Sequence, residues 1–197
     1  MQFRPFEAGV EVNGQTVYAI VDGFKMFKRI PSQILLSEGI GQLGANDVVQ
    51  IDPLAWYSQA AWLRAFERIA REVGTIHLYA IGAKIPENAK FPPSVTDIAT
   101  AIQSIDVAYH MNHRAGGRVL FDPATGRMFE GIGHYGFAQP GPRQIVSRCE
   151  NPYPCDFDRG IITTMARRFE KTVLVEHDDS KPCRQRGDDS CTYIVTW

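Results

Sequence analysis

The sequence predicts an α+β fold in which a helical cluster packs on a mainly antiparallel sheet. Apolar residues recur at helical spacing over residues 52–116, whereas residues 118–149 and the last two apolar segments show the pattern of short strands and turns. The chain has 197 residues without a repeat or a low-complexity linker. We therefore expect a single domain, residues 1–197.

The N-terminal part predicts a hairpin and then a short helix. In the stretch VEVNGQTVYAIVDG, apolar residues alternate around Asn13-Gly14, and this dipeptide is typical of a two-residue hairpin turn. An apolar helix is expected to follow from Ile30 to Gly39.

A longer helix is expected over residues 52–74. Asp52 can cap its first N–H groups, Pro53 suits the first helical position and Gly74 marks its end. One apolar stripe at helical spacing supports this helix: Trp62, Leu63, Phe66, Ile69, Ala70 and Val73.

Two further helices follow in the sequence. The first covers residues 76–86 and ends before Pro86, and the second begins at SVTD, where Ser94 and Asp97 resemble a capping box. The second helix is expected to stop near Gly116-Gly117 and to bury Ile98, Ile102, Ile105 and Tyr109.

The remaining elements are mostly strands. RVLFDPATGRMFEGIG, residues 118–133, predicts a hairpin with turn residues at Asp122-Pro123 and Gly126. A strand over 143–149 and a helix over 157–169 come next. KTVLVEH and CTYIVTW are expected to form the two closing strands, joined by a charged loop.

Composition excludes some classes of partner. The net charge of −1 gives no electrostatic reason to expect nucleic acid or an acidic membrane. No apolar run approaches the roughly 20 residues that span a bilayer, and the N-terminus lacks the apolar run of a signal peptide. These observations predict a cytoplasmic protein.

All four cysteines fall in the last quarter of the chain, and two of them lie in HDDSKPCRQRGDDSC, residues 177–191. One segment between the two predicted closing strands contains His177, Cys183 and Cys191. Zinc prefers four tetrahedral ligands of the thiolate and imidazole type, and Cys155 or Cys149 can supply the fourth. This loop is therefore predicted to bind zinc near the C-terminus.

Three other interpretations of the cysteines stay open. Unliganded structural thiols fit such a polar loop poorly, because a free cysteine behaves as a small buried hydrophobe. A disulfide between Cys183 and Cys191 suits a reducing compartment poorly. A catalytic thiol needs a positive neighbour that lowers its pKa, and Arg184 or Arg186 can provide one.

The segment VEHDDSKPCRQRGDDSCTYIV resembles the C-terminal signature of the 4-vinyl reductase domain family, and the resemblance extends over about residues 149–197. It is also similar to the sensory domains of phenol- and xylene-responsive bacterial transcription activators. In those domains, a cysteine followed five residues later by glycine begins a helix and completes a zinc site. PCDFDRG matches this pattern with Cys155 and Gly160.

The resemblance implies that Cys155, Cys183 and Cys191 are zinc ligands. The activators carry an acid three residues before the first loop cysteine, and this chain has Ser180 there. We therefore expect His177 to be the fourth ligand, with the neighbouring acids as fallbacks: Glu176, Asp178 and Asp179. The resemblance further implies a small-molecule-binding domain with an apolar pocket between helices and sheet.

Several side chains outside the cysteine loop are candidates for the ligand site. Tyr109, His113 and His134 are predicted to line the pocket. His110 and His113 also fit a histidine pair at a helix C-terminus, where the helix dipole favours positive charge. The aromatic residues that can surround an apolar ligand, or form ordinary core, are Trp56, Trp62, Phe66, Tyr109, Phe121, Phe129, Tyr135 and Phe137.

The sequence thus favours a zinc-containing domain that binds or senses a small, largely apolar ligand, aromatic or tetrapyrrole-like, and signals to a partner protein. Self-association as a homodimer is expected from the resemblance. No residue is assigned a catalytic role, and a sensor is favoured over an enzyme. The alternatives are a zinc enzyme with an open metal position and a haem-based sensor.

Overall fold

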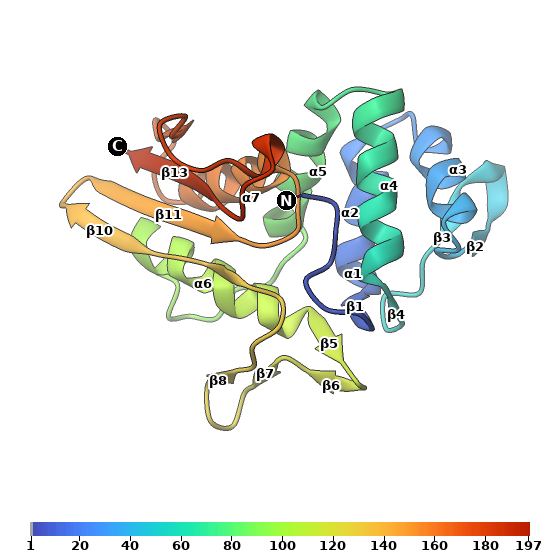
Figure 1. Cartoon of the computed structure of the whole chain (residues 1–197), viewed down its shortest axis with the longest axis horizontal. Coiled ribbons are helices and arrows are strands. Elements are labelled where there is room, and N and C mark those ends of the chain that lie inside the picture. Colours follow the sequence, from blue (N-terminus) through green and yellow to red (C-terminus); the bar gives the residue numbers. More distant parts are fainter. Residues whose placement is uncertain (1) are drawn as a thin grey trace.

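The computed structural model describes residues 2–197 and confirms the α+β class. The fold has a helical part and two main antiparallel sheets, and the helices and the larger sheet lie side by side (Figure 1). The helices of this part are α1 (Gly14–Val17), α2 (Ala19–Gly23), α3 (Arg29–Ser37), α4 (Gln59–Glu72) and α5 (Ile76–Glu87). A two-stranded ribbon, β2 (Gln42–Leu43) and β3 (Val49–Gln50), flanks a 3-10 turn, η1 (Ala45–Asp47), beside α3.

The predicted hairpin at Asn13-Gly14 is wrong. β1 (Val10–Asn13) ends there, and the Asn13 side chain accepts a hydrogen bond from the backbone N–H of Gln15 as the N-cap of α1. A Cβ on Gly14 would lie 2.0 Å from the carbonyl oxygen of Asp52. Glycine is therefore needed there for a close backbone approach, and not for a left-handed turn.

The helix expected over residues 52–74 begins later than predicted. Residues 56–58 form β4 (Trp56–Ser58), which pairs with β1, and the Ser58 hydroxyl then caps α4. The Asp52 side chain instead accepts a hydrogen bond from the N–H of Leu54 in a turn. The first sheet has the order β4-β1-β5-β6, completed by β5 (His113–Ala115) and β6 (Arg118–Val119).

The larger sheet is built mostly from the C-terminal part of the chain. Its strands are β10 (Ala138–Gly141), β11 (Gln144–Glu150), β13 (Cys191–Thr196) and β12 (Leu174–His177), in that order, with β9 (His134–Tyr135) paired to β11. A small ribbon, β7 (Phe121–Asp122) and β8 (Arg127–Met128), forms the hairpin predicted at Asp122 and Gly126. Gly126 has a φ of 73°, as its turn requires.

Helices α6 (Ile98–Met111) and α7 (Cys155–Arg167) link the two parts of the fold. Asp97, rather than Ser94, is the N-cap of α6, and Thr100 completes its capping box. Helices α5 and α7 cross so closely that a Cβ on Gly82 would lie 2.0 Å from the carbonyl oxygen of Phe157. Gly160 is equally close to α5, because its Cβ would lie 2.3 Å from the Tyr79 carbonyl. These two glycines set the position of α7.

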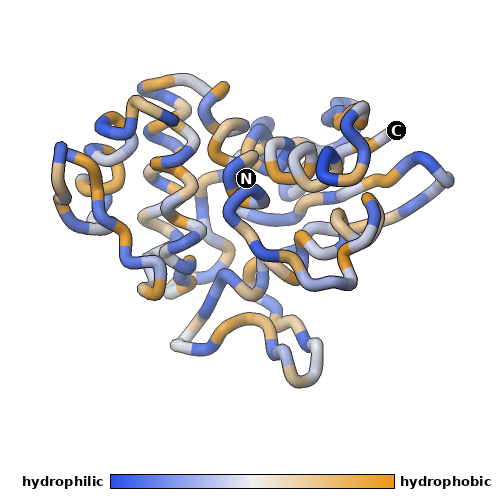
Figure 2. Tube along the Cα trace, turned by 180° about the vertical axis from the view of Figure 1, so that it is seen from behind, coloured by the Kyte–Doolittle hydropathy of each residue, from blue (hydrophilic) through white to orange (hydrophobic). Residues whose placement is uncertain are grey.

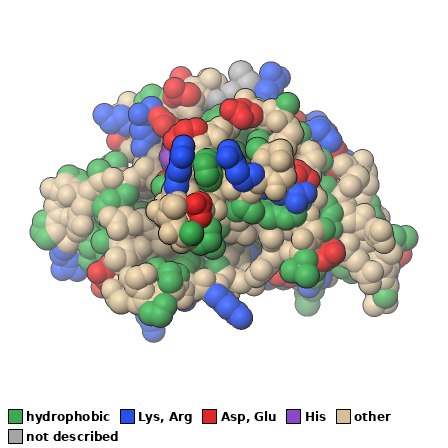
Figure 3. Space-filling view, turned by 90° about the horizontal axis from the view of Figure 1, so that it is seen from below, with side chains coloured by type: hydrophobic (Ala, Val, Ile, Leu, Met, Phe, Trp, Pro, Cys, Tyr) green, Lys and Arg blue, Asp and Glu red, His purple; other side chains and the backbone are tan. Residues whose placement is uncertain are grey.

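Polar and apolar residues interleave along the chain trace (Figure 2). Within residues 2–197, no helix is long and apolar enough to cross a membrane. The face seen from below carries basic and acidic side chains mixed with apolar ones, in keeping with the net charge of −1 (Figure 3).

Candidate functional site

The structure brings Cys155, His177, Cys183 and Cys191 together, although they come from separate elements. Cys155 is the first residue of α7, His177 ends β12 and Cys191 begins β13. Cys183 precedes a 3-10 turn, η2 (Arg184–Arg186), in the loop between these two strands. One ligand atom from each of the four residues lies within 4.8 Å of the others.

The sulfur positions suit a tetrahedral metal. The Cys155 Sγ lies 3.0 Å from the Cys191 Sγ and 3.7 Å from the Cys183 Sγ, and the third sulfur pair is 4.0 Å apart. A tetrahedral zinc with Zn–S bonds of about 2.3 Å separates its sulfurs by about 3.8 Å. A disulfide is absent from this cluster. The three thiols thus form one face of a ready-made coordination site.

His177 is oriented for a fourth metal bond. Its Nδ1 lies 2.8 Å from the Asp179 carboxylate, and its Nε2 is buried with no hydrogen-bond partner among the described residues. A carboxylate that holds one imidazole nitrogen fixes the tautomer and leaves the other nitrogen free for a metal. The donor set and the orphaned Nε2 therefore fit a metal ion of the zinc type.

The other candidates for the fourth ligand lie outside this group of four. Cys149 is buried on β11 opposite Cys191, with its sulfur against Ser147. The Asp178 side chain accepts hydrogen bonds from Ser180, and Glu176 is exposed. Asp179, considered as a fallback ligand, orients His177 instead.

A buried arginine stabilises negative charge at the cysteines. The Nε and the backbone N–H of Arg184 each lie 3.4 Å from the Cys191 Sγ, and the side chain is unexposed. Hydrogen bonding from Cys155 lowers the pKa of the Cys191 thiol, with Arg184 assisting and burial opposing. The same contact, together with burial, raises the pKa of Cys155. Cys191 is thus the preferred thiolate of the cluster.

Arg184 also pairs with Asp158, and neither side chain is exposed. Burial raises the pKa of Asp158, against the lowering effect of Arg184 and of the Tyr135 hydroxyl. Tyr135 donates a 2.6 Å hydrogen bond to this carboxylate, and Asn151 donates another at 3.2 Å. This buried network extends from the cysteine cluster to a side chain of the neighbouring cavity.

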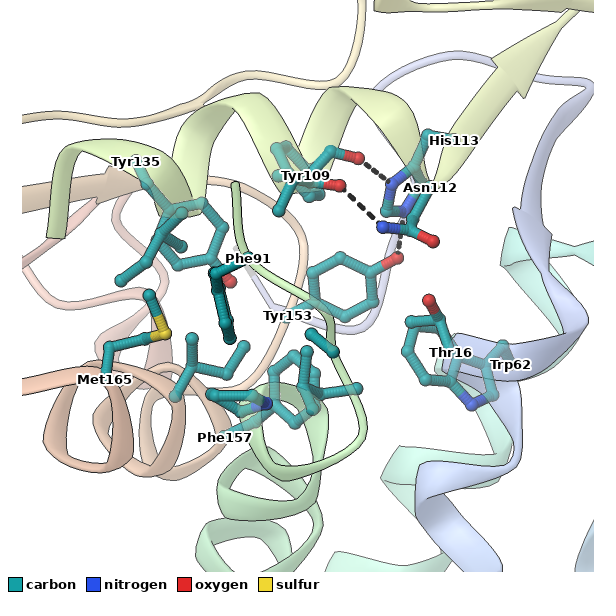
Figure 4. A pocket seen from close by; sticks show the side chains of 16 residues that line it. Thr16, Trp62, Phe91, Tyr109, Asn112, His113, Tyr135, Tyr153, Phe157 and Met165 are labelled. Carbon is teal, nitrogen blue, oxygen red and sulfur yellow. Dashed lines mark hydrogen bonds between the residues drawn. The ribbon is translucent and has the colours of Figure 1, made fainter. Parts of the chain in front are cut away.

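That cavity, of about 80 Å³, lies between α5, α6 and α7 and has predominantly apolar walls (Figure 4). Its lining includes Trp62, Tyr109, Tyr135, Tyr153, Phe157 and Met165. Three of the aromatic residues noted in the sequence, Trp62, Tyr109 and Tyr135, line it. Among the described residues, an arginine, a lysine or an acidic residue is absent from this lining. The cavity therefore suits an uncharged, apolar molecule.

His113 lies at one end of the cavity with both ring nitrogens engaged. Its Nδ1 is 2.7 Å from the Tyr109 carbonyl oxygen, and its Nε2 is 2.6 Å from the Tyr153 hydroxyl (Figure 4). Because a buried imidazolium is poorly solvated, burial lowers the pKa of His113 to about 4. His113 is thus a neutral hydrogen-bonding group at pH 7.

His134 is separate from this lining. It lies on β9 with its Nδ1 2.9 Å from the Asp106 carboxylate, next to the buried His110. Tyr153 is the functional candidate that sequence reasoning missed, and the burial of Arg184, which was considered only as a positive neighbour of a thiol, was not foreseen. Tyr153 follows a proline in an irregular loop, where no periodicity indicates burial, and an arginine in a charged loop is ordinarily exposed.

The fold is similar to that of solved H-NOX proteins. A point mutant of T. tengcongensis H-NOX is 14% identical, with a TM-score of 0.63 over 93% of this chain and 96% of that chain. An S. oneidensis H-NOX in its Fe(II)NO ligation state is also 14% identical, with a TM-score of 0.57 over 93% and 97%. A third structure, from work on haem distortion in the H-NOX family, is 13% identical, with a TM-score of 0.60 over 93% of this chain and 92% of that chain.

No family model and no curated protein matches the sequence. At these identities the likeness defines the architecture, and the chain therefore has an H-NOX-like α+β fold.

Proposed function

We propose that this domain senses a small, largely apolar molecule that it encloses in the cavity between α5, α6 and α7. The observation that carries the proposal is an aromatic-walled cavity without charged lining, built from separate elements. The H-NOX-like fold supports it, because the compared H-NOX structures include one described in a small-ligand-bound Fe(II)NO state. The resemblance to 4-vinyl reductase domains points to the same type of function.

The signal in this proposal is a change in helix packing. Ala108 and Tyr109 of α6 face Phe157 and Met165 of α7 across the cavity. A ligand that binds better to one separation of these helices shifts the population toward it. A partner protein that contacts either helix then registers occupancy. A homodimer also belongs to the proposal.

Zinc at the cysteine cluster is the second component of the proposal. Cys155, Cys183, Cys191 and His177 would hold it, and the ion would join the start of α7 to both ends of the β12–β13 loop. Four protein ligands close a zinc site, whereas catalytic zinc keeps a position for water. This donor set therefore favours a structural metal over the zinc-enzyme alternative.

A haem-based sensor is the second candidate, and the H-NOX likeness favours it. The residues of this cavity do not fit haem as they stand. The lining histidine, His113, has both nitrogens hydrogen-bonded, and the described lining offers no basic side chain for the propionates. The small volume points the same way, so the apolar ligand is the first candidate.

A thermal-unfolding experiment with benzene tests the main proposal. A saturating apolar ligand that binds only the folded state raises the melting temperature. We expect benzene to stabilise the wild-type protein, Ala108→Leu to abolish this effect by filling the cavity, and Gln103→Leu, exposed on the same helix, to preserve it. Equal stabilisation of Ala108→Leu and wild type would refute the cavity as the binding site.

An absorption spectrum separates the two candidates. Titration of the purified protein with haem is expected to give no Soret band of bound haem under the first candidate. A stoichiometric band that is lost in His113→Ala would establish the haem sensor instead. Native mass spectrometry of the same sample reports zinc content, copy number and any co-purified ligand.

A further inference from the structure

A second group of metal-ligating side chains lies outside both the cysteine cluster and the cavity. Asp106 and His110 are one turn apart on α6, and His134 approaches them from β9. One ligand atom from each of the three residues lies within 4.8 Å of the others. Glu130, four residues before His134, extends the group at the surface.

Two carboxylates and two imidazoles meet at one point. His134 Nδ1 lies 2.9 Å from an Asp106 carboxylate oxygen, and its Nε2 lies 3.1 Å from Glu130. The other Asp106 oxygen accepts the Tyr135 backbone N–H and lies 3.6 Å from His110 Nδ1. His110 Nδ1 lies 2.8 Å from the Asp106 backbone carbonyl oxygen, so its Nε2 is the nitrogen left for a ligand.

His110 supplies a second, independent observation. Its side chain is fully buried, yet its Nε2 has no hydrogen-bond partner among the described atoms. Its ring lies 4.8 Å from that of His134, at a tilt of 33°. An unsatisfied buried polar atom costs about 1–3 kcal/mol, so a histidine without a use for this nitrogen would be expensive to keep.

We propose that Asp106, His110 and His134 form a binding site for a divalent transition-metal ion of the zinc class, with Glu130 as an additional oxygen ligand. Two imidazoles and a carboxylate suit such ions, with Ca²⁺ and Mg²⁺ preferring all-oxygen sites. The site is open to solvent on one side, because Glu130 is 83% exposed and His134 is 33% exposed. Metal entry therefore needs no opening of the core. This proposal is independent of the proposed function.

Cobalt titration of the protein as purified tests the site. Thiolate-bound Co²⁺ gives a charge-transfer band in the near ultraviolet, and Co²⁺ held by imidazole and carboxylate does not. We expect one equivalent of Co²⁺ to bind without that band, detected by calorimetry and by visible d–d absorption. This spectroscopic difference separates the site from the cysteine cluster, whatever occupies the latter.

Matched variants test whether these residues hold the bound equivalent of Co²⁺. His134→Gln is expected to remove it, whereas His77→Gln, a histidine stacked on Phe24 away from both groups, retains it. Glu130→Gln changes only an exposed side chain and is expected to weaken binding even if His134→Gln proves unstable. The proposal would be overturned if the wild-type protein bound no Co²⁺ without the charge-transfer band. It would also be overturned if His134→Gln and Glu130→Gln both bound that equivalent of Co²⁺ as tightly as the wild type. The group would then be a structural contact between α6 and β9.

Discussion

Arg184 and Asp158 form an ion pair that is wholly buried between the cysteine cluster and the aromatic cavity. Arg184 contacts the Cys191 sulfur, and Asp158 accepts a hydrogen bond from cavity-lining Tyr135. A buried pair is costly to desolvate and adds little net stability, but removing one partner leaves a bare charge in the core. The two sites of this domain are thus joined by groups that depend on each other.

This dependence predicts a large loss of stability in single variants. Arg184→Met leaves the Asp158 charge without its partner, so we expect the free energy of unfolding to fall by about 3–5 kcal/mol. The double variant Arg184→Met with Asp158→Asn should lose less than the sum of the two single changes. Urea denaturation measures all three, and strictly additive losses would contradict the coupling.

Zinc content should depend on only one of two cysteines that lie side by side. Cys149 and Cys191 lie opposite each other on adjacent strands, but only Cys191 belongs to the group of four. We expect Cys191→Ser to purify without zinc and Cys149→Ser to retain it, as measured by elemental mass spectrometry. Retention of zinc by Cys191→Ser would disprove the ligand assignment.

Asp179 should tune zinc affinity without contacting the metal. Its carboxylate holds His177 Nδ1, and loss of such a partner typically costs about 10–100-fold in metal affinity. Asp179→Asn is therefore expected to weaken zinc binding by about that factor in competition with a chelator. Asp189→Asn, exposed in the same loop, serves as the control and should bind zinc like the wild type.

His113 should make the domain sensitive to acid. Its pKa is about 4 in the folded protein, compared with 6.5 for an exposed histidine. Between these values the unfolded chain binds more protons, so stability is full above pH 6.5 and falls as the pH drops toward 4. The loss is on the order of 3 kcal/mol, from about 1.4 kcal/mol per pKa unit. Denaturation series across this range should show a smaller slope in His113→Gln, and an unchanged slope would rule out His113 as the cause.

Gly82 should be intolerant of any side chain. A Cβ there would overlap the Phe157 carbonyl at 2.0 Å and force α5 away from α7. We expect Gly82→Ala to lower the free energy of unfolding by about 1–3 kcal/mol or more. At Gly141 a Cβ meets no atom within 4 Å, so Gly141→Ala should be close to neutral in the same denaturation experiment.

Sequence patterns predicted the fold class and most helices because local signals determine these features. The stripe through Trp62, Phe66 and Ile69 does lie in a helix, although α4 begins only at Gln59, and the second of the two predicted capping residues, Asp97, caps α6. The Asn13-Gly14 signal misled, because β1 finds its partners in β4 and β5, distant in the sequence. Tertiary pairing there overrides the local turn preference.

The candidate sites were likewise predictable only in part from the sequence. His177, Cys183 and Cys191 were predictable as a group because metal-ligating residue types are rare and clustered in the sequence, whereas the choice of Cys155 over Cys149 came from the resemblance to 4-vinyl reductase and activator domains. Tyr153 was not predictable, because its burial depends on packing against Trp62 and His113, from segments far away in the chain. The grouping of His134 with Asp106 likewise arises only when β9 pairs with β11 beside α6.

Helix α7 belongs to two sites at once. Its first residue, Cys155, is in the cysteine cluster, and Phe157, Ile161 and Met165 line the cavity further along. A helix shifts as a rigid unit, so a substitution that moves its first turn also moves the cavity wall. The cysteine cluster and the cavity wall are therefore mechanically coupled through one helix.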